Sequence, residues 1–307
     1  MSEITLGVNG IRLHVHDVGD GPPVVLAHGF PELAYSWRHQ IPALAEAGYR
    51  VLAPDQRGYG RSDRPPDVED YDIVALTDDL IGLLDAIDAP SAVFVGHDWG
   101  ALVVWDLAQR APERVAGVVG LSVPFSPRFD ARPTDLFRTF FGDDFYILRL
   151  QEPGTVDREL AADVRATFRD IFAGRGGPLP AAAVPLTDEA VAAWLSPEEL
   201  DHYVEVFTRT GFTGAINWYR NFDRNWELSE SWADHTIDAP ALFIAGADDP
   251  VLDLVSPSDM ANHLPNLHAT HLIEAAGHWI QQERPAEVTT ALLTFLATVK
   301  TPTWHPR

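Results

Sequence analysis

The order of apolar and amphipathic stretches along the chain predicts alternating strands and helices. Ile4 to Val8 and Ile11 to His16 alternate in polarity and are joined at Asn9-Gly10, a pair typical of hairpin turns. Apolar runs of strand length follow at 23–27, 49–53, 92–95, 115–123, 240–246 and 268–273. Helical patterns occupy Ser36 to Ala47, Ile73 to Ile87, Ala101 to Leu107, Met260 to Leu264 and Arg284 to Val299, the first of them capped by Ser36 and closed by Gly48. This alternation is typical of a mostly parallel sheet with helices on both faces.

The alternation is interrupted once, between Pro124 and about Trp232. That segment predicts only helices, at Thr134 to Phe141, Val156 to Phe172, Glu198 to Thr208 and Phe212 to Arg220. Joints rich in Gly and Pro separate the helices, and the joint at 174–178 lacks the Lys-Ser/Thr of a phosphate-binding loop. We therefore expect an α/β core formed by residues 1–124 and 233–307, with a helical cap at 125–232 inserted after the sixth strand.

The composition limits the classes of binding partner and the cellular compartment that we expect for this protein. The chain has 307 residues and a net charge of −23, from 22 basic and 45 acidic side chains, which argues against nucleic acid and anionic membranes as partners. With no Cys, the chain has neither disulfides nor a thiol nucleophile. No signal-peptide pattern is present, and no run approaches the roughly 18 apolar residues of a transmembrane helix. We expect a soluble, cytoplasmic protein.

The main chemical signal is the pentapeptide Gly96-His97-Asp98-Trp99-Gly100, between a predicted strand and a predicted helix. Glycines two residues before and after the central position permit a sharp strand-to-helix turn that exposes the middle side chain. The pattern matches the nucleophile elbow G-x-S-x-G, with Asp98 in place of Ser. A carboxylate needs no base to deprotonate it, and its attack on an sp³ carbon gives an ester. The alternative is that Asp98 only caps the following helix.

Taken together, the motifs of the chain resemble those of an epoxide hydrolase of the α/β-hydrolase family, of the soluble epoxide hydrolase type. The resemblance covers about residues 3–299 and implies the α/β-hydrolase fold, a mostly parallel sheet with helices on both faces and an inserted helical cap. It depends on six motifs in a fixed order: HGFP at 28–31, RGYGRSD at 57–63, GHDWG at 96–100, QEPG at 151–154, NWYRN at 217–221 and GHWIQQERP at 277–285.

A catalytic triad is completed by residues after the nucleophile, in the order acid and then base. His278 follows Gly277 just past the last predicted strand, where a loop can bring it over Asp98. Two acids end the preceding strand, and the resemblance places the triad acid immediately before Pro250, which favours Asp249 over the alternative Asp248. The acid would fix the imidazole tautomer and stabilise the imidazolium.

The resemblance also implies the groups that stabilise oxygen atoms. Backbone N–H groups of Phe30 and Trp99 would form the oxyanion hole for hydrolysis of the ester. Tyr146 and Tyr219, both in the cap, would donate hydrogen bonds to the epoxide oxygen, although both could instead be ordinary packing residues. An apolar substrate pocket would be lined by Phe30, Trp99, Trp218 and Trp279.

The expected reaction is hydrolysis of an epoxide to a vicinal diol through a covalent ester on Asp98, which water activated by His278 releases. No cofactor and no metal are implied; the partners are an apolar small-molecule epoxide and water, and the protein is a monomer or a homodimer. A haloalkane dehalogenase would use the same Asp and bind halide with Trp99, whereas a haloacetate dehalogenase usually has a basic residue beside the nucleophile, absent here. Neither needs the two tyrosines. The fold also serves as a small-molecule receptor, but a full catalytic set argues against that role.

One histidine pair falls outside this scheme. His14 and His16 share one face of a predicted strand, at the spacing of two metal ligands. Because the sequence indicates no third ligand, we interpret both as ordinary strand residues.

Overall fold

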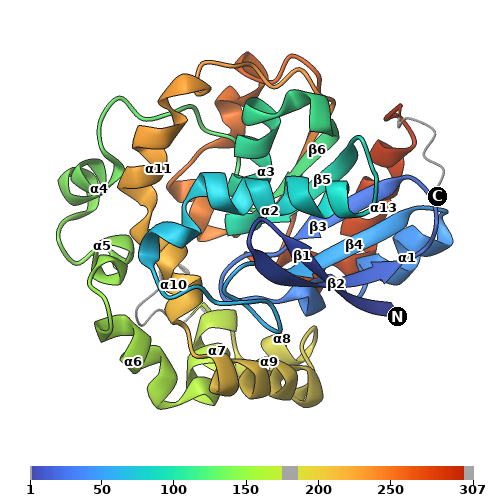
Figure 1. Ribbon diagram of the computed structural model, residues 1–307. Helices are drawn as coiled ribbons and strands as arrows, with labels where there is room; N and C mark the ends of the chain where they lie inside the picture. Colours follow the sequence, from blue (N-terminus) through green and yellow to red (C-terminus); the bar gives the residue numbers. More distant parts are fainter. Residues whose placement is uncertain (1, 175–185, 301–307) are drawn as a thin grey trace.

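The computed structural model describes residues 2–174 and 186–300, and its centre is an eight-stranded sheet of order β1-β2-β4-β3-β5-β6-β7-β8 (Figure 1). Strand β2 is antiparallel to both of its neighbours, and the remaining pairs are parallel. The strands are β1 (Ser2–Val8), β2 (Ile11–Val18), β3 (Pro23–Ala27), β4 (Arg50–Asp55), β5 (Ala92–His97), β6 (Val115–Leu121), β7 (Ala241–Gly246) and β8 (Leu267–Ile273). The predicted α/β class and mostly parallel sheet are confirmed.

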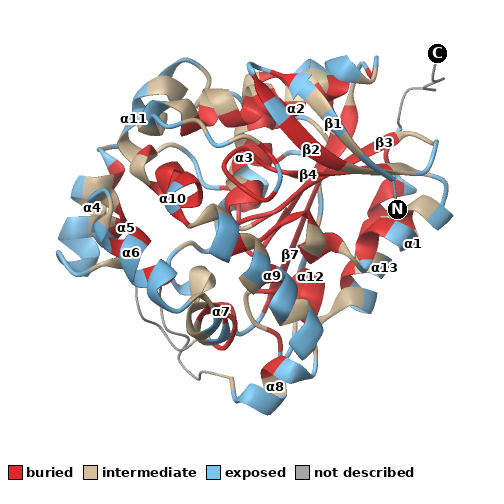
Figure 2. Ribbon diagram, turned by 60° about the horizontal axis from the view of Figure 1, so that its bottom comes forward, coloured by how far each residue is buried: buried red, intermediate tan, exposed pale blue. Residues whose placement is uncertain are grey.

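Helices cover both faces of this sheet, and the alternation of side chains along β5 shows why. Phe94 packs into a cluster with residues of α2 (Ile73–Ala86) and α3 (Trp99–Arg110). Val93 and Val95 pack on the opposite face with residues of α1 (Gln40–Glu46) and α13 (Pro285–Leu296). Because side chains alternate between the faces of a strand, β5, all of whose residues are buried, packs against helices on both sides. The strands in the centre of the sheet are accordingly coloured as buried in Figure 2.

Three predicted helices differ from the structure in their bounds. The stretch 36–47 is a short 3₁₀ turn at Ala34–Trp37 followed by α1 from Gln40, so Ser36 is not an N-cap. Pro42 accounts for the break, since its missing N–H and fixed φ fit only the first turn of a helix. The stretch 156–172 is two helices, and the Asp163 side chain caps the second one by accepting the Ala166 N–H at 3.0 Å. The predicted helix at 260–264 is a 3₁₀ segment at Pro257–Asn262.

The helical insertion between β6 and β7, called the cap below, lies along one side of the core (Figure 1). The sequence did not predict the short helices α5 (Tyr146–Gln151) and α11 (Phe222–Leu228). Residues 175–178 of the predicted Gly-rich joint lie outside the described residues. The cap helices are α4 (Pro133–Phe141), α5 (Tyr146–Gln151), α6 (Thr155–Ala162), α7 (Val164–Phe172), α8 (Asp188–Ala192), α9 (Pro197–Thr210), α10 (Thr213–Arg220) and α11 (Phe222–Leu228).

Polar contacts between largely buried groups join the cap to the core. Arg38 of the core donates to Glu199 of α9 at 2.5 Å and to the backbone carbonyl of Trp194 in the cap at 3.3 Å. The Trp218 indole of α10 donates to the backbone carbonyl of Arg57 at 3.1 Å. These bonds set the position of the cap over the sheet. Within 2–174 and 186–300, no helix has the length and apolar character needed to cross a membrane.

Candidate active site

Asp98 occupies the turn between β5 and α3, with φ 53° and ψ −119°. Positive φ is rare for residues other than Gly and costs on the order of 1–3 kcal/mol, which the surrounding structure must offset. Both flanking glycines are required, because a Cβ on Gly96 would lie 2.1 Å from the Gly100 carbonyl oxygen, and a Cβ on Gly100 would lie 2.1 Å from that of Ala27. The Asp98 side chain makes no N-cap hydrogen bond to α3, so it is available to other partners.

The two oxygens of the Asp98 carboxylate have different neighbours. Oδ1 accepts the backbone N–H of Phe30 at 2.8 Å. Oδ2 lies 3.5 Å from Nε2 of His278. Within the described part of the chain, the backbone N–H of Trp99, the second predicted oxyanion donor, makes no hydrogen bond to this carboxylate. Oδ1 is therefore held in place by the backbone, whereas Oδ2 faces the imidazole.

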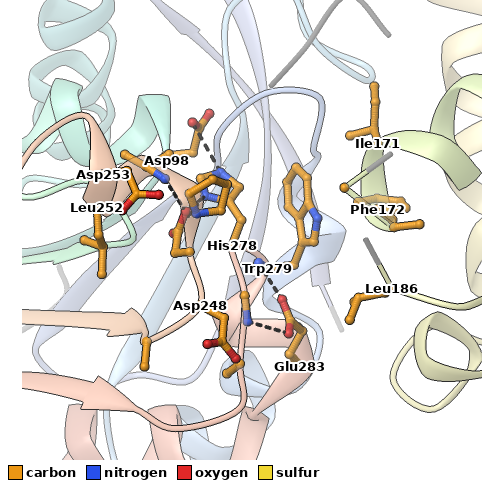
Figure 3. Close-up of a pocket in the computed structure, with 18 of the residues that line it drawn as sticks. Asp98, Ile171, Phe172, Leu186, Asp248, Leu252, Asp253, His278, Trp279 and Glu283 are labelled. Atoms are coloured by element: carbon orange, nitrogen blue, oxygen red, sulfur yellow. Dashed lines mark hydrogen bonds and ion pairs between the residues drawn. The ribbon is translucent and has the colours of Figure 1, made fainter. Parts of the chain in front are cut away.

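Asp249, and not Asp248, contacts the imidazole of His278. Its two carboxylate oxygens lie 3.0 and 3.1 Å from Nδ1 of His278, and its side chain is completely buried. Oδ1 also accepts the backbone N–H of Val251 at 2.9 Å, which fixes the carboxylate at the start of a 3₁₀ turn. The Asp248 side chain is exposed and lines the neighbouring cavity (Figure 3).

The charges of Asp98, His278 and Asp249 shift the pKa values of both His278 and Asp98. Burial alone lowers the pKa of His278, but the charges and hydrogen bonds of Asp249 and Asp98 outweigh it and hold that pKa well above its usual value. Burial alone raises the pKa of Asp98, but the interactions with His278, the charge of His97 and the Phe30 N–H lower it overall. Both shifts favour an imidazolium beside a carboxylate over the neutral pair.

A second buried chain of hydrogen bonds holds the backbone of His278. Its carbonyl accepts from the Ser122 hydroxyl at 2.8 Å and from Nε2 of His97 at 2.7 Å. Nδ1 of His97 lies 2.6 Å from the carboxylate of Glu32, and both side chains are completely buried. Sequence reasoning missed this chain. Its only signal is that His97 adjoins the nucleophile and Glu32 directly follows HGFP.

The two cap tyrosines lie over the nucleophile. Tyr146 begins α5, Tyr219 lies near the end of α10, and their ring centroids are 6.3 Å apart. Burial, and then the charge of Asp98, raise the pKa of both phenols, which keeps them protonated as hydrogen-bond donors. Gln151, from the QEPG motif, joins the two helices by donating to the Tyr219 carbonyl at 2.9 Å.

Asp98, His278 and both tyrosines line one cavity of about 560 Å³, a size typical of small-molecule sites. One wall is apolar and consists of Ile171, Phe172, Leu186 and Trp279 (Figure 3). Of the predicted pocket residues, Phe30 and Trp279 line this cavity.

Two predicted pocket residues, Trp99 and Trp218, are not among the residues that line this cavity. Trp218 is fully buried against Tyr59 and Trp99, so it supports the wall from behind. The Trp99 ring packs edge-on against the Tyr219 ring, with the two centroids 5.1 Å apart.

Comparison with known proteins shows which family this chain resembles. Residues 22–285 match the family model described as alpha/beta hydrolase fold. Epoxide hydrolase A of Mycobacterium tuberculosis is 53% identical over 96% of this chain and 97% of its own length. Bifunctional epoxide hydrolase 2 of Sus scrofa is 39% identical over 94% of this chain and 54% of its own length.

Solved structures agree with these sequence relatives. The crystal structure of Epoxide Hydrolase A from Mycobacterium thermoresistibile is 53% identical, covers 98% of this chain and 99% of its own, and superposes with a TM-score of 0.92. Epoxide hydrolase I of potato (Solanum tuberosum) is 36% identical, with 96% and 99% covered and a TM-score of 0.91. The chain therefore belongs to the epoxide hydrolases of the α/β-hydrolase fold.

Proposed function

We propose that this protein hydrolyses epoxides to vicinal diols through a covalent ester on Asp98. The observation that carries the proposal is that one cavity holds a carboxylate, an imidazole–carboxylate pair and two protonated tyrosines. The carboxylate and imidazole come from the core, and the phenols come from the cap. An epoxide needs both sets, because its carbon must be attacked while its oxygen receives a hydrogen bond.

In the first step, Oδ2 of Asp98 attacks an epoxide carbon and the carbon–oxygen bond of the ring breaks. Oδ2 is the attacking atom because Oδ1 is already engaged by the Phe30 N–H. Tyr146 and Tyr219 donate hydrogen bonds to the ring oxygen as it takes up the electron pair, and one of the two phenols gives it a proton that solvent then replaces. The product of this step is an ester whose carbonyl oxygen is Oδ1 of Asp98.

In the second step, water attacks the carbonyl carbon of the ester. Esterification removes the negative charge of Asp98, which is one of the causes of the raised pKa of His278. The pKa of His278 consequently falls, the imidazolium loses its proton to solvent, and the neutral imidazole can accept a proton from water. Asp249 orients the ring and stabilises the imidazolium that forms. The Phe30 N–H, already on Oδ1, stabilises the oxyanion. Collapse of this intermediate breaks the bond between the carbonyl carbon and the substrate oxygen, which takes the imidazolium proton and leaves in the diol, while Asp98 loses the proton of its new carboxyl group and returns to the carboxylate.

The dehalogenase alternative is less well supported by the surroundings of Trp99. Halide binding would require its indole N–H to face the leaving group, and Trp99 is not among the residues that line the cavity. Paired phenols above the nucleophile have no function when the leaving group is a halide. We therefore prefer the epoxide as electrophile.

The cavity also favours a class of epoxide. Its apolar wall suits aryl and alkyl substituents. Asp248 and Asp253, both exposed, line the same cavity and add negative charge near its polar side. A neutral, apolar epoxide is therefore preferred over one that carries a carboxylate.

A panel of neutral aryl and alkyl epoxides, with matched carboxylated analogues and 1-haloalkanes, tests this proposal. Diol formation should be catalysed with the neutral epoxides, and halide release should be absent. Asp98→Asn protein, with the fold verified by circular dichroism, is the control. Efficient halide release by the wild type, or no diol from any epoxide, would contradict the proposal.

A further inference from the structure

Pairing of β1 with β2 brings an acidic side chain to the histidine pair on β2. In the antiparallel register Glu3 lies directly opposite His16, and His14 is two residues along on the same face. The two imidazole centroids are 5.7 Å apart. One ring nitrogen of each histidine and one Glu3 carboxylate oxygen all lie within 4.8 Å of one another. The structure thus supplies the third ligand that the sequence did not indicate.

The two histidines are not exposed surface residues. The His14 side chain is 7% exposed, and Nε2 of His14 lies 3.8 Å from the Glu3 carboxylate. His16 is half-buried, and its Nδ1 is buried without a hydrogen-bond partner among the described residues. A buried nitrogen without a partner is unfavourable. A bound cation would satisfy this atom.

The chemistry of the donors selects the class of cation. Imidazole suits transition metals such as Zn²⁺, Ni²⁺ and Cu²⁺, whereas Ca²⁺ and Mg²⁺ prefer oxygen ligands. Metal–nitrogen distances of about 2.0–2.1 Å require donor atoms closer together than 4.8 Å, so side-chain rotations must close the group. Three protein ligands leave further positions for water.

One neighbouring cation competes with a metal for this group. Arg61 donates to Glu3 at 2.5 Å, but both side chains are largely exposed, at 60% and 43%. An exposed ion pair of this kind is weak, and both side chains can reorient. Asp55, on the neighbouring strand, is already committed to the backbone N–H groups of Ala34 and Arg61 and is not counted as a ligand.

From these contacts we propose that Glu3, His14 and His16 form a binding site for a divalent transition-metal ion. The site is separate from the catalytic cavity, since none of the three residues lines it. The ion would tie the edge strand β1 to β2. Its binding should therefore raise the melting temperature of the protein without being needed for epoxide turnover.

Calorimetric titration of the full chain, free of any histidine tag, with ZnCl₂ and NiCl₂ tests the site. We expect one equivalent of metal per chain and a rise in melting temperature. His16→Gln and Glu3→Gln should weaken binding by about tenfold or more, as loss of metal-site partners typically does. His271→Gln, which removes an exposed histidine on β8, is the matched control and should bind as the wild type does.

Arg61→Gln gives the opposite expectation, namely tighter binding, because it frees the Glu3 carboxylate. A second measurement does not depend on any variant: electron paramagnetic resonance of the Cu²⁺-loaded wild type should show hyperfine coupling to two nitrogens. Wild-type protein that binds no metal at millimolar concentration would overturn the proposal. So would His14→Gln/His16→Gln protein that is folded and binds like the wild type.

Discussion

The core and the cap contribute to the same cavity, but they hold their side chains by different means. In the core, hydrogen bonds fix each reacting group: Phe30 N–H on Asp98 at 2.8 Å, Asp249 on His278 at 3.0 Å, and two donors on the His278 carbonyl. In the cap, Tyr146 and Tyr219 are positioned mainly by where α5 begins and α10 ends and by packing of aromatic rings. The core is the more rigidly specified half of the site.

This difference matches the demands of the two chemical steps. Ester formation and hydrolysis need one atom of Asp98 and one of His278 in a fixed geometry, whatever the substrate is. The epoxide oxygen, in contrast, changes position with the substituents of the substrate. Phenols on a separate group of helices can be repositioned by substitutions in the cap without disturbing the triad. Variants in the two halves should therefore fail at different steps.

The largest effect should come from the core residues that react with the substrate. Asp98→Ala should abolish ester formation, whereas His278→Gln should still form the ester and fail to release it. Mass spectrometry of the protein after incubation with an epoxide should show an increase equal to the mass of the epoxide only for His278→Gln. Turnover at the wild-type rate by His278→Gln would remove its assignment as base.

The next effect concerns the two adjacent acids of the core. Asp249→Asn should slow hydrolysis of the ester, by up to about 10⁴-fold if its role resembles that of a triad acid, since the imidazole would lose its orientation and its stabilised cation. Asp248→Asn is the matched control and should hydrolyse a neutral epoxide at nearly the wild-type rate. Single-turnover kinetics separate the two steps. The reverse ranking would transfer the role of acid to Asp248.

In the cap, Tyr146→Phe and Tyr219→Phe should each slow formation of the ester, and the double variant should be close to inactive. General acid assistance is typically worth about 10²- to 10⁴-fold, and both variants leave the triad in place. Rapid-quench mass spectrometry gives the rate of ester formation. Full epoxide opening by the folded double variant would show that the cap phenols are only packing residues.

A smaller effect should appear in the pH dependence, which also separates the two steps. Acid protonates His278, so hydrolysis of the ester should fall about tenfold per pH unit once the pH is below the pKa of His278 in the ester. The lowered pKa of Asp98 keeps that carboxylate ionised to lower pH, so ester formation should persist. The ester should consequently accumulate in acid. If the rate of ester hydrolysis stayed constant as the pH fell while the rate of ester formation declined, the assignment of the two pH dependences would be wrong.

The smallest effect should be at the charged side of the cavity. Asp248→Asn removes an exposed negative charge that lines it, so kcat/KM for a carboxylated epoxide should rise by a few-fold. The same variant should leave kcat/KM for the uncharged analogue unchanged. Assays at low and high ionic strength provide the check, because salt should reduce the difference. An equal change for both epoxides would exclude a charge effect.

Local sequence determined the features of this protein that depend on the backbone conformation of a few neighbouring residues or on the order of apolar and polar positions. The strand-to-helix turn at Asp98 could be predicted because such a turn requires glycine at positions 96 and 100. The structure shows the close contacts that exclude a Cβ at both positions. The alternating α/β pattern followed from the periodicity of apolar residues. Where a local rule was applied incompletely, the prediction was wrong: Ser36 suggested an N-cap, but Pro42 places the start of the helix at Gln40.

Tertiary structure decided those contacts between distant side chains that no motif indicates. The resemblance favoured Asp249 over its neighbour Asp248, and the direction of the chain after β7 turns Asp249 toward His278 and Asp248 toward solvent. Glu32 and His97 are 65 residues apart, and strand pairing in the centre of the sheet makes them neighbours. No local sequence pattern predicts such a contact, because the two residues become neighbours only when the strands of the whole sheet have paired. The proposed metal ligand Glu3 differs from these cases, because the predicted hairpin turn at Asn9-Gly10 already implies that Glu3 pairs with His16.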